Sequence, residues 1–161
     1  MQGGIQKQIE GNAEKLTRLK SYLAEGYLLH GSKNRIEVLE PRQATDDNPE
    51  RKTGKAHAIY AEDGDLRIPI VRALFAEKDP VPRSWRAGYS THGPDTPIIV
   101  TGENCTFTPG FVHVLPPDTF EVEGDEGDNE RISRVPVASI DIIEVDPSIL
   151  DELPGIKIDF K

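Results

Sequence analysis

The spacing of apolar residues divides the chain into an early helical part and a longer part made of short strands. Leu16, Leu19 and Leu23 recur at three- and four-residue intervals, which predicts a helix over residues 5–24. A second apolar face of the same period predicts a helix over residues 65–76. Further along, frequent prolines and glycines make other long helices unexpected.

Short apolar runs bounded by glycine, proline or polar residues predict strands along the rest of the chain. These strands are expected over residues 27–30, 35–39, 56–61, 98–100, 111–115, 119–123, 130–134 and 140–145. The polar segment 101–110 is expected to join the strands on either side of it as a hairpin. Residues 43–55 and 77–97 are expected to be irregular, and the first of these loops is long enough to be a functional lid.

The order of these elements predicts an α+β fold with a strand-rich body. No internal repeat and no linker interrupts the sequence, so residues 1–161 are expected to form a single domain. Residues 1–25 would be an N-terminal helical extension that packs on a body formed by residues 26–161.

The charge of the chain restricts the partners that it can have. Its 28 acidic residues outnumber its 19 basic residues and give a net charge of −9, so nucleic-acid binding is unexpected. Cys105 is the only cysteine, which excludes an intramolecular disulfide and makes the cytoplasm the expected location. No run of 18 apolar residues and no signal-peptide pattern is present, so no membrane association is expected.

Several common catalytic patterns are missing from the sequence. There is no glycine-rich phosphate-binding loop and no nucleophile elbow. The four histidines lie far apart, and no second cysteine could complete a thiolate zinc site, so no metal site is expected. Candidate chemistry therefore rests on polar residues at the ends of strands.

The first predicted strand ends in a distinctive way. In residues 26–32 an apolar run leads into His30, Gly31 and Ser32. A glycine at the tip of a strand would let a ligand come close to the main chain. Taken alone, a histidine in this place is more often a core-edge residue with one satisfied hydrogen bond.

Two more residues follow at strand boundaries, and together with the first they form an ordered set of motifs. Tyr60 ends the second strand just before a helix, and Glu130 begins a late strand after an acidic turn. The segments resemble the three motifs of ADP-ribosyltransferases of the His-Tyr-Glu class, which includes diphtheria-type toxins and poly(ADP-ribose) polymerases. They read Leu29-His30-Gly31-Ser32, Ala58-Ile59-Tyr60-Ala61 and Glu130-Arg131-Ile132-Ser133, and the resemblance covers residues 26–146.

The resemblance implies a split, mostly antiparallel β core and an activity that uses NAD. The protein would transfer ADP-ribose from NAD to a protein, nucleic-acid or small-molecule acceptor, or it would hydrolyse NAD. A bacterial toxin, phage or defence setting would be typical of a small stand-alone member, an inference by analogy of fold. An RNA 2′-phosphotransferase shares this fold, but it fits a chain of net charge −9 less well.

The resemblance also implies a role for each motif residue. His30 would donate a hydrogen bond to a ribose hydroxyl, and Gly31 and Ser32 would face the nicotinamide-ribose end of NAD. Tyr60 would stack on the nicotinamide ring. Glu130 would be the catalytic carboxylate, because cleavage of the bond between nicotinamide and ribose builds positive charge on the sugar, as in glycoside hydrolysis.

Structural alternatives exist for these roles. Tyr60 could be an ordinary core aromatic, and Glu130 could be a solvated charge in an acidic hairpin. Glu123 and Glu144 compete for the catalytic role. Glu130 is preferred because a further segment and a last strand follow it, as they follow the third motif of the family. His113 would be a structural strand residue.

A second hypothesis belongs to another functional class. The chain could be a non-catalytic nucleotide-binding or protein-interaction domain on the same scaffold, with a homodimer formed through its N-terminal helix. Substitution of Glu130 would separate this hypothesis from the enzymatic one. Arg42, Arg51 and Lys52 could reach the diphosphate of NAD, or they could simply be solvated residues of a loop.

Overall fold

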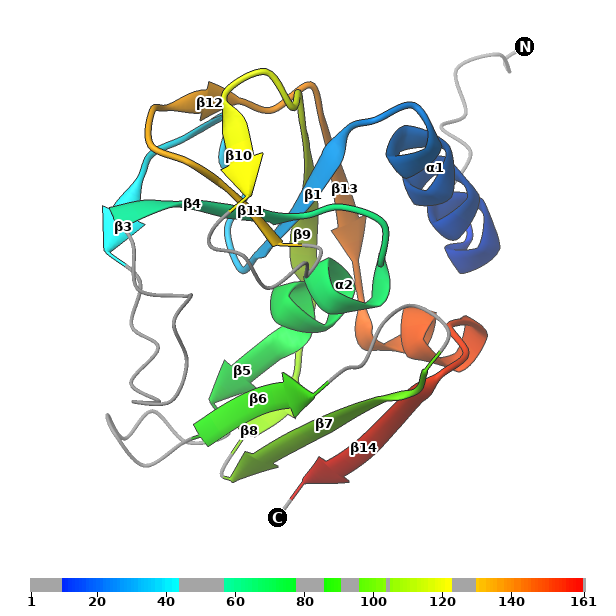
Figure 1. Ribbon diagram of the computed structural model, residues 1–161. Coiled ribbons are helices and arrows are strands. Elements are labelled where there is room, and N and C mark those ends of the chain that lie inside the picture. The colour runs from blue at the N-terminus through cyan, green and yellow to red at the C-terminus, as the bar shows by residue number, and fades with distance from the viewer. Residues whose placement is uncertain are drawn as a thin grey trace, which may run out of the picture.

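A seven-stranded antiparallel sheet is the main layer of the computed structural model (Figure 1). The structure describes residues 10–43, 57–77, 86–90, 96–103, 105–122 and 130–160. The strand order of the sheet is β10-β11-β4-β1-β9-β13, and β3 pairs with β4 outside this path. The strands are β1 (Leu28–Ser32), β3 (Arg42–Gln43), β4 (His57–Glu62), β9 (Gly110–Leu115), β10 (Phe120–Val122), β11 (Glu130–Ser133) and β13 (Asp141–Val145). The predicted α+β class is therefore confirmed.

Three smaller sheets accompany the main one. A three-stranded sheet has the order β14-β7-β6, and its β14–β7 pair is parallel. Two two-stranded sheets pair β5 with β8 and β12 with β2. The strands are β2 (Val38–Leu39), β5 (Phe75–Glu77), β6 (Arg86–Ser90), β7 (Ile98–Glu103), β8 (Cys105–Phe107), β12 (Val137–Ala138) and β14 (Ile156–Phe160).

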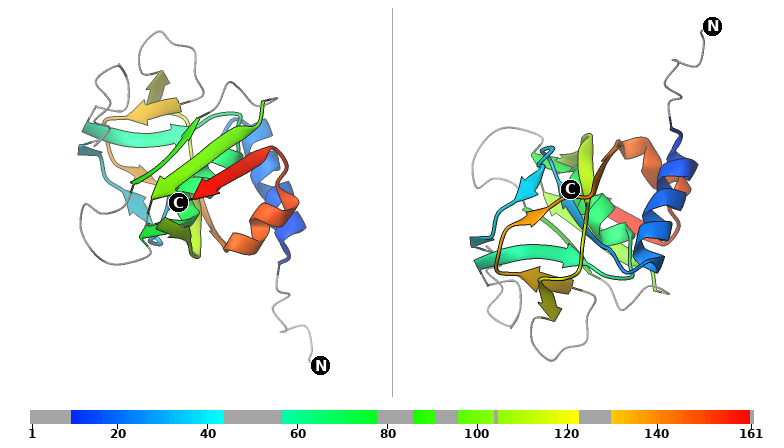
Figure 2. Two further views of the ribbon diagram at one scale, coloured as in Figure 1. Left: turned by 90° about the horizontal axis from the view of Figure 1, so that it is seen from below. Right: turned by 90° about the horizontal axis from the view of Figure 1, so that it is seen from above.

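Two α-helices and a 3₁₀ helix pack beside the main sheet: α1 (Asn12–Ala24), α2 (Arg67–Leu74) and η2 (Pro147–Glu152). Figure 2 shows α1 and η2 lying side by side at one edge of the molecule, where Asn12 Nδ2 donates to Ser148 Oγ at 2.9 Å. The chain leaves α1 through Gly26, whose φ of +98° favours glycine. Gly26 therefore lies just past the helix in the position that ends it.

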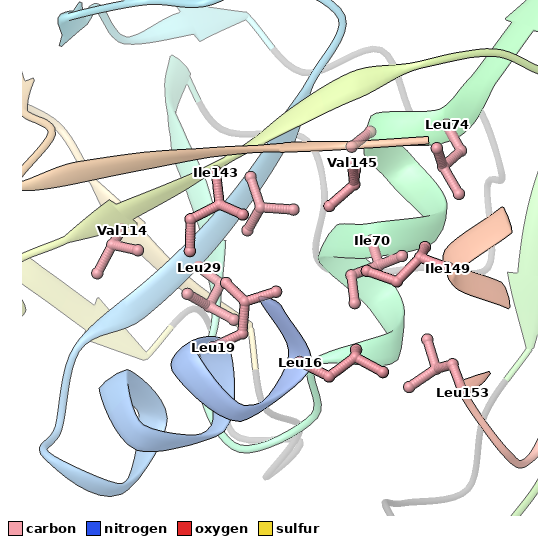
Figure 3. Packing of buried hydrophobic residues seen from close by; sticks show 12 residues of the cluster. Leu16, Leu19, Leu29, Ile70, Leu74, Val114, Ile143, Val145, Ile149 and Leu153 are labelled. Carbon is pink, nitrogen blue, oxygen red and sulfur yellow. The ribbon is translucent and has the colours of Figure 1, made fainter. Parts of the chain in front are cut away.

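The largest apolar cluster lies between the helices and one face of the main sheet (Figure 3). It joins Leu16 and Leu19 of α1 to Leu29 of β1 and Ile70 of α2. Its other buried members are Ala73, Leu74, Val112, Val114, Ile143, Val145, Ile149 and Leu153. The apolar stripe of the first predicted helix thus serves to dock α1 onto the sheet.

A second apolar cluster covers the opposite face of the sheet. It contains Leu28, Leu39, Ile59, Ala61, Leu115 and Val137, with β2 and β12 among its contributors. Successive side chains of a strand point to opposite faces. Leu28 and Leu29 therefore belong to different clusters, and the same alternation assigns every residue of β1 and β4 to a face. We call the face with Leu29 the α2 face, and the face with Leu28 the far face.

Several predicted elements differ from those observed. The hairpin between the 98–100 and 111–115 strands is wrong, because β7 pairs with β14 and β6 while β9 pairs with β1 and β13. The segment between them forms β8, which pairs with β5. Such pairings are set by contacts between segments far apart in the sequence, and a short apolar run does not specify its partner.

The ends of several elements also differ. The first helix begins at Asn12, α2 spans Arg67–Leu74 instead of 65–76, and the 35–39 strand shrinks to Val38–Leu39. Strand β6 occupies 86–90 inside a segment expected to be irregular, and β14 forms beyond the last strand that the sequence predicts. Most of the 43–55 loop lies outside the described residues. Within the part of the chain that the structure describes, no helix is long and apolar enough to cross a membrane.

Candidate functional site

The first predicted motif lies where two neighbouring strands of the main sheet separate. Strand β1 pairs with β9 over its whole length, from Leu28 opposite Leu115 to Ser32 opposite Phe111. On its other side β1 pairs with β4 only at Leu29 and Glu62. Within the described residues, no strand pairs with β1 beyond that point on the β4 side. We call this opening the β1–β4 split.

The backbone of Gly31 faces the β1–β4 split. Val114 O accepts a hydrogen bond from Ile140 N–H at 2.9 Å on the β13 side, so the backbone groups of Val114 point away from β1. Leu29 and Val114 are therefore a non-hydrogen-bonded pair, and by alternation so are Gly31 and Val112. It follows that the N–H and the C=O of Gly31 both point toward β4, where the two strands have separated.

The glycine at this position is required by helix α2. A Cβ at Gly31 would overlap Pro69 O of α2, and a Cβ at Gly110 would overlap Ala73 O of the same helix. Gly31 therefore has a packing role that the sequence did not predict, beside its expected role of letting a ligand approach the main chain. The missing side chain lets α2 pack on the sheet, and the backbone N–H and C=O face the β1–β4 split.

We expect Gly31→Ala to lower the free energy of unfolding by about 3 kcal/mol, because the new methyl group must push α2 off the sheet. Gly11→Ala is the matched control, since a Cβ at Gly11 meets no atom within 4 Å. It should change stability by less than about 1 kcal/mol. Urea denaturation of both variants measures the difference, and equal stabilities would contradict the close packing of α2.

His30 hydrogen-bonds across the β1–β4 split. Its Nδ1 lies 2.5 Å from Tyr60 O, and because a carbonyl can only accept, Nδ1 carries the proton. Burial lowers the pKa of His30 to about 4, although the hydrogen bond to Tyr60 opposes this, and Arg72, His113 and Arg42 lower the pKa further. The ring is therefore neutral at pH 7, and its Nε2 carries a lone pair that can accept a hydrogen bond.

His113 is a structural residue, as expected. It lies directly opposite His30, is fully buried, and its ring meets the His30 ring edge to face at a centroid distance of 5.9 Å. Its Nε2 accepts from Ile36 N–H at 3.0 Å, and its Nδ1 lies 3.3 Å from His30 O. Burial lowers the pKa of His113, which suits a neutral ring that accepts at Nε2 and donates at Nδ1.

The lowered pKa of His30 predicts acid sensitivity. In the unfolded chain the pKa of histidine is about 6.5, so between pH 6.5 and about 4 the unfolded state binds more protons than the folded one. The stability that His30 contributes is therefore complete above pH 6.5 and is lost as the pH falls toward 4, by about 3 kcal/mol.

We expect His30→Asn to reduce this acid-induced loss, because asparagine can donate to Tyr60 O and does not titrate. Urea denaturation between pH 4 and pH 7 measures it. The His113 contribution should remain in the variant. If the stability of His30→Asn depends on pH as strongly as that of the native protein, the acid sensitivity does not come from His30.

The structure places Tyr60 and Glu130 on one face of the sheet and His30 on the other. Leu29 lies opposite Glu62, and Glu62 lies opposite Glu130, so all three point to the α2 face. Tyr60 shares this face by alternation. His30 belongs to the far face, and it reaches Tyr60 only through the hydrogen bond across the β1–β4 split.

Glu130 is a buried residue and not a solvated charge. Its exposed fraction is 8%, and that of Glu62 is 5%. One oxygen of each carboxyl group, Glu130 Oε1 and Glu62 Oε2, is fully buried. Sequence reasoning missed Glu62, although its alternation with Tyr60 along β4 is the signal that could have found it.

The tip of β1 is held by side chains that follow the motif. Ser32 Oγ accepts from Asn34 N–H at 3.2 Å, and Ser32 belongs to the far face with His30. Lys33 Nζ donates to Thr108 O at 2.9 Å and to Thr108 Oγ1 at 2.8 Å, and burial lowers the pKa of Lys33 to about 8. Ser32 thus ends β1 with its hydroxyl bonded to the segment that follows, on the face opposite Tyr60 and Glu130.

The other predicted site residues are the carboxylates that compete with Glu130 and the basic residues that could bind the diphosphate of NAD. Glu144 is exposed on β13, which two strands, β1 and β9, separate from β4. Arg42 is exposed on β3 and lies close enough to His30 to lower its pKa. Glu123, Arg51 and Lys52 lie outside the described residues.

No group of three or more metal-ligating side chains occurs among the residues that the structure describes. In comparisons with known proteins, no family model, no curated protein and no solved structure matches this chain.

Proposed function

We propose that the protein binds NAD with its nicotinamide end in the β1–β4 split, and that it cleaves the bond between nicotinamide and ribose. The observation that carries this proposal is the orientation of the Gly31 backbone, whose N–H and C=O face the split together. A carboxamide has one donor and one acceptor on the same side, so it pairs with both groups at once.

The residues on the α2 face supply the remaining chemistry. Tyr60 is partly exposed beside the split, where its ring can stack on the nicotinamide. Glu130 lies on the same face one strand further. As the C1′–N bond breaks, its electron pair leaves with neutral nicotinamide, and the carboxylate of Glu130 stabilises the positive charge left on the ribose.

The second half of the reaction consumes the charged ribose. An acceptor oxygen, from water or from another hydroxyl compound, forms the new bond to C1′ and releases its proton. Water as the acceptor gives NAD hydrolysis, and another acceptor gives ADP-ribosyl transfer.

His30 takes a different part from the one implied by the resemblance. Its Nδ1–H is used by Tyr60 O, so the neutral ring can only accept at Nε2. We therefore assign it as a hydrogen-bond acceptor on the far-face side of the split, and not as a donor to the substrate. The hydrogen bond to Tyr60 fixes the ring, which orients the acceptor nitrogen before the substrate binds.

Calorimetric titration of the protein with NAD tests the binding step, and chromatography of released nicotinamide tests the chemistry. Nicotinic acid adenine dinucleotide is the matched control ligand, because its carboxylate cannot donate to Gly31 O. We expect it to bind at least about tenfold more weakly than NAD. Failure of NAD to bind would favour the non-catalytic interaction domain.

A further inference from the structure

Strand β14 is an open edge of the three-stranded sheet. It pairs with β7 on one side and forms the outer strand of this sheet (Figure 1). Among the residues that the structure describes, no strand pairs with its other side. The unpaired backbone groups of such an edge can form hydrogen bonds with a strand of another chain.

The backbone groups of β14 point alternately to β7 and to the open side. Gly155 O accepts a hydrogen bond from Ile98 N–H at 2.8 Å, and Ile98 is the register partner of Ile156. In a parallel pair, a residue bonded in this way uses the residues on either side of its partner, so Lys157 also faces β7. By alternation, three residues of β14 direct their N–H and C=O groups to the open side: Ile156, Ile158 and Phe160.

The central side chain of this edge is apolar and incompletely covered. Ile158 shares a face of the sheet with its register partner Val100, which is fully buried. Its neighbours on that face, Ile156 and Phe160, pack against a buried cluster, whereas Ile158 is 47% exposed. A further strand beside β14 would remove apolar surface of Ile158 from water.

The sequence of β14 is complementary to an inverted copy of itself. Antiparallel pairing of two copies about Ile158 places Lys157 of each copy opposite Asp159 of the other, and Ile156 opposite Phe160. Ile158 then faces its own copy with both backbone groups, as a hydrogen-bonded pair. Lys157 and Asp159, both exposed, form the intervening non-hydrogen-bonded pair, in which side chains lie closest.

The same two charges disfavour the neighbouring registers. A shift of two residues keeps the outward backbone groups opposite one another, but it places Lys157 against Lys157 or Asp159 against Asp159. Like charges directly opposite each other destabilise a pair of strands. A shift of one residue would set outward backbone groups against groups already bonded to β7.

We infer that two copies of this chain associate through β14, antiparallel about Ile158, and that the two three-stranded sheets become one continuous sheet. The interface differs from the dimer through the N-terminal helix that the sequence suggests, and it does not depend on the binding of NAD. Because β14 has only five residues, the interface is small and the association is weak.

Sedimentation velocity of the full chain at increasing concentration tests the association. We expect the monomer to pass into a dimer as the concentration rises to about 1 mM. A protein that stays monomeric at that concentration would overturn the inference.

Reversal of the charges tests the register. Lys157→Asp and Asp159→Lys should each raise the Kd of the dimer at least about tenfold, because two attractive pairs become two repulsive ones. An equimolar mixture of these two variants should form a dimer again, and so should the double variant Lys157→Asp/Asp159→Lys. Lys20→Asp, the same charge change at an exposed position of α1, is the matched control and should keep the native Kd.

Equal weakening of the dimer by Lys20→Asp and Lys157→Asp would overturn the inference, as would single variants that keep the native Kd. Hydrogen exchange supplies a second readout. The amide of Ile158 should exchange more slowly as the protein concentration rises, while that of Lys157, which faces β7, should not change. Exchange at Ile158 that does not slow while a dimer forms would place the interface elsewhere.

Discussion

Glu130→Gln should lower the rate of nicotinamide release from NAD by about 10³-fold, because an amide cannot stabilise the positive charge that develops on the ribose. The substitution preserves the size of a side chain that is only 8% exposed. We therefore expect the fold to survive, with a far-ultraviolet circular dichroism spectrum like that of the native protein. The assay follows nicotinamide by chromatography at saturating NAD.

Two matched variants control this experiment. Glu144→Gln removes the same charge from an exposed position on β13, and its rate should stay within about twofold of the native rate. Glu123→Gln tests the remaining candidate of the third motif. A folded Glu130→Gln protein with the native rate would remove the catalytic assignment, and loss of activity in Glu144→Gln alone would move it to that residue.

Arg67→Met should lower the free energy of unfolding by about 4 kcal/mol. The buried guanidinium donates to the Asp65 carboxylate through Nε at 3.0 Å and Nη2 at 2.8 Å, and through Nη1 to Thr96 O and Gly155 O, both at 2.8 Å. These bonds tie the start of α2 to the segments that lead into β7 and β14. Methionine keeps the packing volume but leaves the Asp65 charge buried without the guanidinium.

A double-mutant cycle distinguishes the ion pair from simple packing. The variant that combines Arg67→Met with Asp65→Asn should be more stable than the sum of the two single losses predicts, because the buried charge is then removed as well. Chemical denaturation of the four proteins measures the interaction. If the two losses of stability are strictly additive, the charges of Arg67 and Asp65 contribute nothing beyond the packing of their side chains.

The local elements around the site could be predicted from the sequence because their signals are local. Apolar runs and turn residues correctly predict three strands: the one that carries His30, the one that carries Tyr60 and the one that begins at Glu130. The apolar stripe of α1 and the stop at Gly26 are signals of the same kind.

The arrangement of those elements could not be predicted, since it depends on long-range register. Nothing local shows that Glu62 faces Glu130, or that β1 leaves β4 after Leu29. The sequence also does not show that helix α2 packs against Gly31. In the structure, a side chain at this position would overlap α2. Strand β14 was missed because it is an edge strand whose partner, β7, lies more than fifty residues earlier.

The proposed reaction requires the backbone of Gly31 to bind the carboxamide of nicotinamide. Nitrogen NMR of protein labelled at glycine, titrated with nicotinamide, tests that claim at a single amide. We expect the Gly31 amide resonance to shift, with Gly110 and Gly11 as internal references that do not. Nicotinic acid should leave the Gly31 resonance in place at the same concentrations. A Gly31 amide that does not respond to nicotinamide, or that responds equally to both compounds, would contradict the account.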